Sequence, residues 1–206
     1  DSLDPAKYLK ITRGGNLEQV LEGLNIAKKN GLKIKINTVA LKNTNIDEIS
    51  KLVKWCIKKD FDITFIEVMP MDMENSTRLN QYYPLTKIKS LLKKEFTLIK
   101  TNINTGGPSK YSKIKDCNTK IGFITPLSNN FCESCNRVRL TCTGKIYSCL
   151  GHNNFIDLKK ALKKNKKELK KLILESILLK PKSHEFEIKK ENKEKNLERT
   201  MNVTGG

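Results

Sequence analysis

The sequence predicts an α/β fold with parallel strands, because amphipathic helical patterns alternate with strand patterns through its first half. Asn16 and Gln19 resemble a helix-capping pair, and apolar residues then recur at helical spacing up to a stop at Gly31. Residues 33–41 alternate apolar and polar side chains, as a half-buried strand does. A second helix and a second strand follow in the same order.

The second helix is predicted to begin at Asn45, with Glu48 completing the cap. Its apolar face comprises Ile46, Ile49, Leu52, Val53 and Cys56. Residues 63–69 form an apolar run that predicts a buried strand. Helix, strand, helix and strand at this spacing indicate parallel β/α units.

After Pro70 the pattern changes: an amphipathic helix is predicted over 86–96 and a short strand over 121–125. A long helix is predicted over 158–180, divided at Asn165 and ended by Pro181. Its predicted inner face is Leu158, Leu162, Leu169, Leu172, Ile173 and Ile177.

The chain has 206 residues and a formal net charge of +18, a length that supports one core or two small ones. Lysines concentrate in helix-like tracts such as 158–179, which favours a solvated basic surface over a nucleic-acid partner. Neither a membrane-spanning apolar run nor a signal peptide is visible. The first residue is Asp1, from which we expect a chain that was processed or cut from a longer one.

Six cysteines are present, and Cys132, Cys135, Cys142 and Cys149 fall within eighteen residues. Disulfides in a small secreted domain are spread along the chain, so this clustering favours metal ligation in a reducing compartment. Spacing alone leaves two kinds of metal centre open, with free structural cysteines as the less favoured alternative. The commoner interpretation is a closed zinc site, in which Cys132, Cys135 and Cys149 are joined by either His152 or Cys142. The other is a [4Fe–4S] cluster with three thiolate ligands and one open iron.

The residues around the cysteines closely resemble the GTP 3′,8-cyclase family of the radical S-adenosylmethionine (SAM) superfamily, which catalyses the first step of molybdenum cofactor biosynthesis. Five segments carry the resemblance in order along nearly the whole chain. They are Ser2–Pro5 with Ile11–Asn16, Phe65–Pro70, Gly122–Pro126, Phe131–Leu150 (FCESCNRVRLTCTGKIYSCL) and Val203–Gly206.

The resemblance implies that Cys132, Cys135 and Cys149 ligate the family's second [4Fe–4S] cluster, whose open iron meets the guanine of GTP. Arg137 and Arg139 match paired basic positions beside the substrate. Residues two apart in extended backbone point the same way, so two guanidinium groups could grip one anion.

Three further positions carry expectations from the family. Lys35 matches a lysine that reaches the triphosphate; strand alternation places it and Asn37 opposite Ile34 and Ile36, toward a barrel interior. Met69 falls where the family contacts SAM. Thr64 is a departure, because the family commonly has arginine there, so one anion contact is in doubt.

The chain ends in Gly205-Gly206, and in the resembled family this tail enters the enzyme's own active site; we therefore predict a catalytic role for both glycines. Ubiquitin-like sulfur carriers also end in Gly-Gly, but the cysteine cluster and the parallel α/β pattern argue against a carrier. The C-x₃-C-x₂-C motif that binds the first cluster of radical SAM enzymes is absent from the sequence. The expected fold is therefore an incomplete, partial TIM-type barrel over residues 1–80, followed by a cluster domain over 81–206.

The resemblance predicts that the chain is part of an enzyme that converts GTP to (8S)-3′,8-cyclo-7,8-dihydroguanosine 5′-triphosphate, and that it supplies the cluster that binds GTP. A 5′-deoxyadenosyl radical would abstract the ribose 3′ hydrogen, and the carbon radical would attack guanine C8. The predicted partners are GTP, SAM, an electron donor and a downstream cyclic pyranopterin synthase, with no membrane and no nucleic acid; homodimerisation is left open. The expected location is cytoplasmic, or mitochondrial if a targeting segment precedes the chain. The alternative function is a zinc-stabilised nucleic-acid-binding module, which the 6% aromatic content disfavours.

Overall fold

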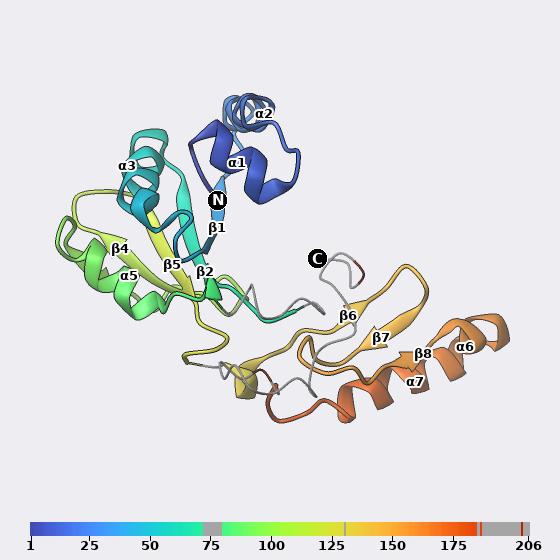
Figure 1. Ribbon diagram of the computed structural model, residues 1–206. Helices are drawn as coiled ribbons and strands as arrows, with labels where there is room; N and C mark the ends of the chain where they lie inside the picture. The colour runs from blue at the N-terminus through green and yellow to red at the C-terminus, as the bar shows by residue number, and fades with distance from the viewer. Residues whose placement is uncertain (72–79, 130, 185, 187–202, 204–206) are drawn as a thin grey trace. The chain divides into compact units, whose positions relative to one another are not determined.

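The computed structural model describes residues 1–71, 80–129, 131–184, 186 and 203, which belong to two compact units (Figure 1). The first unit comprises residues 1–68 and 80–129, and the second comprises 69–79 and 130–206. This division differs from the predicted 1–80 and 81–206, because residues 80–129 complete the sheet of the first unit.

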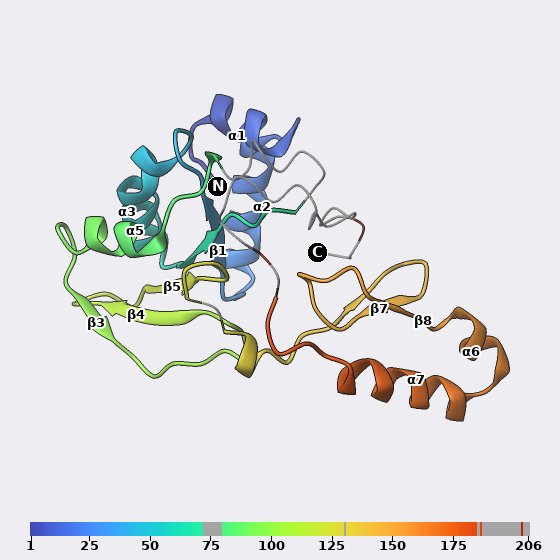
Figure 2. The ribbon, with the colours of Figure 1, turned by 60° about the horizontal axis from the view of Figure 1, so that its bottom comes forward.

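The first unit is built on a five-stranded mixed sheet of order β1–β2–β5–β4–β3, whose strands are labelled between Figures 1 and 2. Its strands are β1 (Lys35–Ala40), β2 (Asp62–Glu67), β3 (Leu98–Lys100), β4 (Lys110–Ile114) and β5 (Lys120–Ile124). β1, β2 and β5 are parallel, as the helix–strand alternation predicts, whereas β4 and β3 add an antiparallel edge. The α/β class is therefore confirmed, with a mixed sheet in place of an all-parallel one.

Four α-helices and one 3₁₀ turn belong to the described part of this unit: α1 (Pro5–Thr12), α2 (Leu17–Lys29), the 3₁₀ turn η1 (Ile46–Glu48), α3 (Ile49–Lys59) and α5 (Leu85–Leu92). The predicted cap of α2 is confirmed, because the Asn16 side chain accepts a hydrogen bond from the Gln19 amide at 3.1 Å. The predicted cap at Asn45 is wrong. Its side-chain oxygen accepts from the Leu41 amide, and its amide group donates to the carbonyls of Asp1 and Val39. Asn45 therefore links the loop after β1 to the N-terminal residue and to the end of β1 through its side chain.

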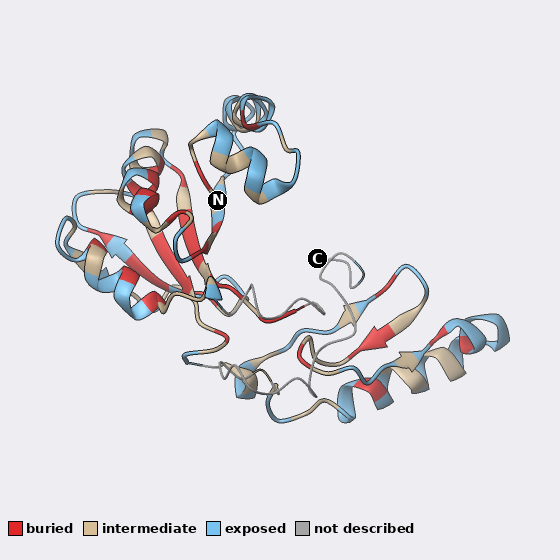
Figure 3. Ribbon diagram, in the orientation of Figure 1, coloured by how far each residue is buried: buried red, intermediate tan, exposed pale blue. Residues whose placement is uncertain are grey.

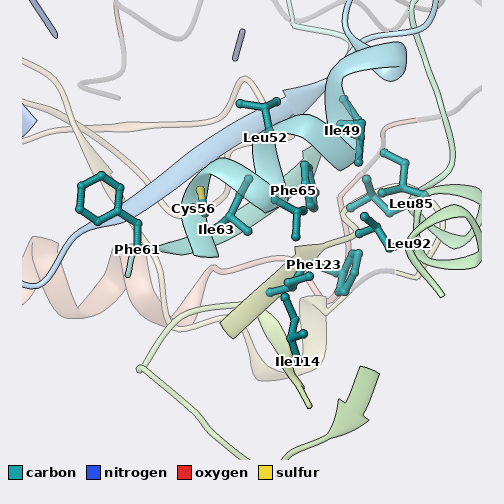
Figure 4. Close-up of a cluster of buried hydrophobic side chains, with 14 residues drawn as sticks. Ile49, Leu52, Cys56, Phe61, Ile63, Phe65, Leu85, Leu92, Ile114 and Phe123 are labelled. Atoms are coloured by element: carbon teal, nitrogen blue, oxygen red, sulfur yellow. The ribbon is translucent and has the colours of Figure 1, made fainter. Parts of the chain in front are cut away.

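The hydrophobic core lies between one face of this sheet and the helices α3 and α5 (Figures 3 and 4). Ile63 and Phe65 of β2 and Ile121 of β5 contribute from the sheet, and each is at most 2% exposed. The helices contribute Ile49, Leu52, Val53, Cys56, Leu85, Ile88 and Leu92. Removing an aliphatic or aromatic side chain of this size from water contributes about 1.5–3 kcal/mol, so this face holds the unit together.

The opposite face of the sheet carries polar residues at neighbouring positions. The register pairs Asn37 of β1 with Thr64 of β2, Thr64 with Gly122 of β5, and Gly122 with Tyr111 of β4. Paired positions in a sheet share a face, and Lys35 lies two residues before Asn37 on the same side. Ile36 packs against the core instead. The predicted orientation of Lys35 and Asn37, away from the apolar face, is confirmed.

The second unit contains a small antiparallel sheet of order β6–β7–β8, with the 3₁₀ turn η2 before it and two helices after it. The elements are η2 (Cys132–Ser134), β6 (Arg139–Leu140), β7 (Lys145–Tyr147), β8 (Ile156–Asp157), α6 (Lys159–Lys164) and α7 (Lys166–Leu178). Asn165 separates α6 from α7 as predicted, and its side chain caps α7 by accepting from the Glu168 amide at 2.8 Å.

The predicted inner face of α6 and α7 is only partly correct. Leu158 is buried, and Leu169, Leu172 and Ile173 are half-buried. Leu162 and Ile177 are exposed, because the break at Asn165 interrupts the helical register that would align one continuous stripe.

Among the described residues, no helix is both long and apolar enough to cross a membrane.

Candidate functional site

The three predicted ligand cysteines lie at one end of the β6–β7 hairpin. Cys132 opens η2, and the amide of Cys135 donates to the Cys132 carbonyl at 3.1 Å, which closes a tight turn. The last pair of the hairpin at this end is Arg139 with Tyr147, so the segment before Arg139 and the segment after Tyr147 leave it together. Cys135 and Cys149 therefore arrive at the same end of the hairpin from its two strands.

The Cys149 thiol interacts electrostatically with both of the other predicted ligands. Burial raises the pKa of the Cys149 thiol, and the neighbouring Cys132 and Cys135 add to that increase. The Gly151 amide, 3.4 Å from the sulfur, and the Lys180 charge act in the opposite direction. Ligation requires thiolates, so a bound cation would have to complete the deprotonation that Lys180 and the amide favour.

Cys142 and His152 are placed differently from these three thiols. Cys142 is exposed in the turn between β6 and β7, where Gly144 has a φ of 83°, so it lies at the opposite end of the hairpin from Cys149. His152 Nε2 is 2.9 Å from the Ser183 carbonyl oxygen. Each zinc site predicted from spacing would need one of these two side chains to turn toward the cysteines.

The remaining cysteines belong to the first unit. Cys56 is in its core, where burial, followed by the charge of Asp62, raises the thiol pKa to about 12. Cys117 packs against the same core. Within the residues that the structure describes, no three Cys, His, Asp or Glu side chains are drawn together closely enough to hold a single metal ion. The donor set at the hairpin end is three thiols on two short loops, and this chemistry fits an iron–sulfur cluster.

Arg137 and Arg139 occupy the segment between Cys135 and the hairpin. Arg139 is half-buried in β6, whereas Arg137 is exposed two residues earlier. Ion pairs among the described residues do not include either guanidinium group. Both arginines thus lie in the chain segment that carries the thiols, as predicted.

Lys35 lies in the first unit, on the polar face of the sheet. Its Nζ donates to the Tyr111 hydroxyl at 3.3 Å, and the Thr105 hydroxyl is 3.2 Å from the same oxygen. Burial acts to raise the pKa of Tyr111, but the hydroxyls of Thr105 and Ser109 and the Lys35 ammonium outweigh it, so the pKa is lowered. This arrangement gives the sheet face a positive charge beside a polarised phenol.

Gly122 leaves space on this face for three neighbouring side chains. A Cβ at this position would lie 2.2 Å from Ser109 Oγ, 2.7 Å from Thr64 Oγ1 and 2.9 Å from Tyr111 Cε1. The Thr64 hydroxyl is buried and has no hydrogen-bond partner among the described residues. The polar face therefore has one spare hydroxyl beside Gly122, in addition to the Ser109 hydroxyl that acts on Tyr111.

We expect Gly122→Ala to lower the free energy of unfolding by about 1–3 kcal/mol, the usual cost of overpacking a filled site. The matched control is Gly23→Ala on the exposed surface of α2, where an added Cβ meets nothing within 4 Å. That substitution should raise stability by roughly 0.5–1 kcal/mol through helix propensity. Urea unfolding of the full chain measures both, and equal effects at the two glycines would contradict the packing described here.

Comparison with known proteins identifies the family. Residues 61–186 match the family described as Molybdenum Cofactor Synthesis C, and residues 1–56 match the radical SAM superfamily. The chain belongs to the Molybdenum Cofactor Synthesis C family. The first match includes all three clustered thiols and both arginines, and the second includes Lys35.

Curated relatives align with the whole chain. It is 46% identical over 208 residues to proteins named GTP 3′,8-cyclase from Bradyrhizobium diazoefficiens and Brucella ovis. It is 45% identical to the protein of that name from Nitrobacter winogradskyi. Each alignment covers 100% of this chain and 60% of the relative, so the chain spans about three fifths of the length of these relatives.

Of the three remaining positions predicted from the family, the structure describes only Met69. Met69 is half-buried and follows β2 by two residues, and its carbonyl accepts from the Met71 amide at 2.8 Å. Gly205 and Gly206 lie outside the described residues. Their predicted role, like those of the thiols, the arginines and Lys35, stays a prediction.

Glu67 is a buried residue that the sequence analysis did not single out. Its carboxylate is 1% exposed and accepts from the amides of Leu127 and Ser128, both at 3.0 Å, and from the Ser128 hydroxyl at 2.5 Å. The Tyr82 hydroxyl lies 3.4 Å away. Burial raises the pKa of Tyr82, and the Glu67 charge adds to this. The available signal was a carboxylate inside the apolar run 63–69.

Proposed function

We propose that this chain is the part of a GTP 3′,8-cyclase that holds the second iron–sulfur cluster and helps to bind GTP. The observation that carries the proposal is the alignment of its whole length, at 46% identity, with proteins of that name. The reaction would convert GTP to (8S)-3′,8-cyclo-7,8-dihydroguanosine 5′-triphosphate at the start of molybdenum cofactor biosynthesis.

In this proposal Cys132, Cys135 and Cys149 hold the cluster. The arrival of Cys135 and Cys149 at one hairpin end, and the electrostatic interaction of Cys149 with each of the other two thiols, support the assignment. When bound, such a cluster would supply one iron without a protein ligand, able to accept a donor atom of guanine. Iron–sulfur clusters are held by thiolates, and this donor set contains no carboxylate.

The triphosphate would be held by Lys35, Arg137 and Arg139. Guanidinium groups bind phosphate oxygens through paired hydrogen bonds, and an ammonium adds a compact charge. The Tyr111 hydroxyl, with its lowered pKa, sits beside Lys35 as a further donor. Thr64 offers an unpartnered hydroxyl at the position where the family commonly has an arginine, so a hydroxyl donor would replace a charge there.

The remaining assignments rest on the family. The first unit would form part of an incomplete barrel and the second a cluster domain. Met69 would contact SAM, which, with a first cluster elsewhere in the enzyme, would supply the radical that starts the reaction. Gly205 and Gly206 would enter the active site, where a backbone without Cβ atoms suits a narrow cavity. An electron donor and a downstream cyclic pyranopterin synthase would complete the set of partners.

The test uses the complete protein, reconstituted with iron and sulfide without oxygen and supplied with GTP, SAM and a reductant. We expect the cyclised nucleotide and 5′-deoxyadenosine in equal amounts, and GTP bound more tightly than GMP. Arg137→Ala, Arg139→Ala and Lys35→Ala should each weaken GTP binding by about 1.5–3 kcal/mol, roughly 10- to 150-fold.

The matched control is Lys33→Ala, which removes the same charge from an exposed residue two positions before Lys35. If Lys33→Ala weakens GTP binding as much as Lys35→Ala, the contribution is general charge and not a site. If random oligonucleotides bind as tightly as GTP with a steep salt dependence, the nucleic-acid alternative gains and the cyclase proposal fails.

A further inference from the structure

Lys180 joins the two segments that carry the cysteines. Its Nζ donates to the Arg137 carbonyl at 2.7 Å and to the Ser148 carbonyl at 2.6 Å. The first carbonyl lies two residues after Cys135, and the second lies immediately before Cys149. One half-buried ammonium therefore connects both sides of the hairpin end where the thiols lie.

The strand pairing of the hairpin stops before these two segments. The β6–β7 pairing ends with Arg139 and Tyr147. Two strands that leave a hairpin without further pairing are free to separate, and backbone carbonyls that lose their strand partners need other donors. Lys180 supplies two of its three N–H groups to them.

The position of Lys180 is fixed by the helix before it and the proline after it. α7 packs on β7 and ends at Leu178. The Lys180 amide then donates to the Ile177 carbonyl at 3.1 Å. Pro181 follows, which restricts the backbone of the preceding residue. A long side chain on a restrained backbone can hold two loops at a defined separation, which a mobile surface lysine does not do.

We propose that Lys180 is a positioning residue that holds the Cys132–Cys135 loop against the Cys149 segment and so prepares the three thiols for a cluster. Its role toward the cluster rests on the proposed function, whereas its contacts with the two carbonyls do not. Lys180 contacts backbone and acts through the cysteines, so it is not itself a ligand. Its charge would also lie close to the cluster and favour the more negative, reduced form.

Three variants of the complete protein test this: Lys180→Met, Lys180→Arg and Lys170→Met. Methionine keeps the length and loses the donors and the charge, whereas arginine keeps both. Lys170 is exposed on α7 and serves as the control. The first measurement is amide hydrogen exchange over 135–138 and 148–151 in the iron-free protein. We expect exchange at least about tenfold faster in Lys180→Met than in the other two, since a restraint on the backbone is lost.

The second measurement is the rate of iron release to a chelator after reconstitution, with the midpoint potential of this cluster. Residues that support metal ligands typically change affinity 10- to 100-fold, so release should be roughly tenfold faster in Lys180→Met and within about threefold of the native rate in Lys180→Arg. The potential should become more negative in Lys180→Met only. A protein with a structural lysine alone would lose stability without this charge-dependent shift.

Native exchange and native iron release in Lys180→Met would overturn the proposal. If the unaltered protein takes up no cluster, the proposed function fails, and the exchange rates alone then confirm or reject the link between the segments. If Lys180→Met does not fold, Lys180→Gln replaces it, because glutamine stays polar but loses the charge and is one atom shorter, so it cannot span both carbonyls as lysine does. The same faster exchange is then expected, and its absence counts equally against the proposal.

Discussion

Cys149→Ala is expected to remove about four irons and four sulfides per chain from the reconstituted protein. Cys132→Ala and Cys135→Ala should do the same, because a cluster held by three thiolates does not survive on two. The structural reason is the shared hairpin end, from which Cys142 is separated because it lies in the opposite turn. Cys56 is committed to the core of the first unit. Iron and sulfide analysis under nitrogen measures the loss.

The controls are Cys142→Ala and His152→Ala, which should leave iron content unchanged. Cys142 is exposed, and the His152 contact with the Ser183 carbonyl is at the surface, so both changes should cost little stability. Loss of metal on His152→Ala, together with one tetrahedral zinc per chain that survives in air, would establish the zinc site and end the cluster proposal.

Much of the first unit could be predicted because its patterns are local. Residues 17–29, 35–40 and 62–67 form the expected helix and strands, and each has an apolar face that periodicity shows directly. The cluster segment was also accessible, because its thiols are close together in sequence. What periodicity could not give was the antiparallel edge. β3 and β4 are three and five residues long, too short for an alternating pattern to stand out from a lysine-rich background.

The incorrect or incomplete predictions have a common physical cause, which is that side chains serve distant partners. Asn45 was expected to cap a helix, but it satisfies the backbone of Asp1, Val39 and Leu41. Thr64 appeared only as a missing arginine, whereas in the sheet it lies beside Gly122 of the neighbouring strand, which leaves room for its hydroxyl. Lys180 was predicted only as the last residue of a helix. The sequence around it does not show that its ammonium group will donate to the carbonyls of Arg137 and Ser148, forty-three and thirty-two residues earlier.

Glu67 is the buried residue of this kind with the most contacts to one loop. Its carboxylate, at the end of β2, accepts three hydrogen bonds from Leu127 and Ser128. A buried carboxylate is costly unless donors surround it, and buried amides are costly without an acceptor. The two groups therefore depend on each other. They fix the chain just before the segment that begins at Phe131 and carries the cysteines.

Glu67→Ala should accordingly lower the free energy of unfolding by about 3–5 kcal/mol, because it leaves two amides without an acceptor and opens space at a fully packed position. Glu67→Gln keeps the volume and one acceptor oxygen, so we expect about half that loss. Urea unfolding of the full chain measures the stability. Amide exchange at Leu127 and Ser128 measures the loop, and it should accelerate in both variants more than in the β2 strand that carries Glu67.

Tyr82→Phe is the matched control, since it removes the 3.4 Å contact to the same carboxylate and keeps the ring. A hydrogen bond this long contributes little, so the loss should stay near 0.5–1 kcal/mol and exchange at Leu127 and Ser128 should not change. Ser128→Ala should lie between the two, because it removes one donor and leaves both amides satisfied. A loss in Glu67→Ala no greater than in Tyr82→Phe would mean that water replaces the carboxylate freely, and that the loop before the cysteines is held by something else.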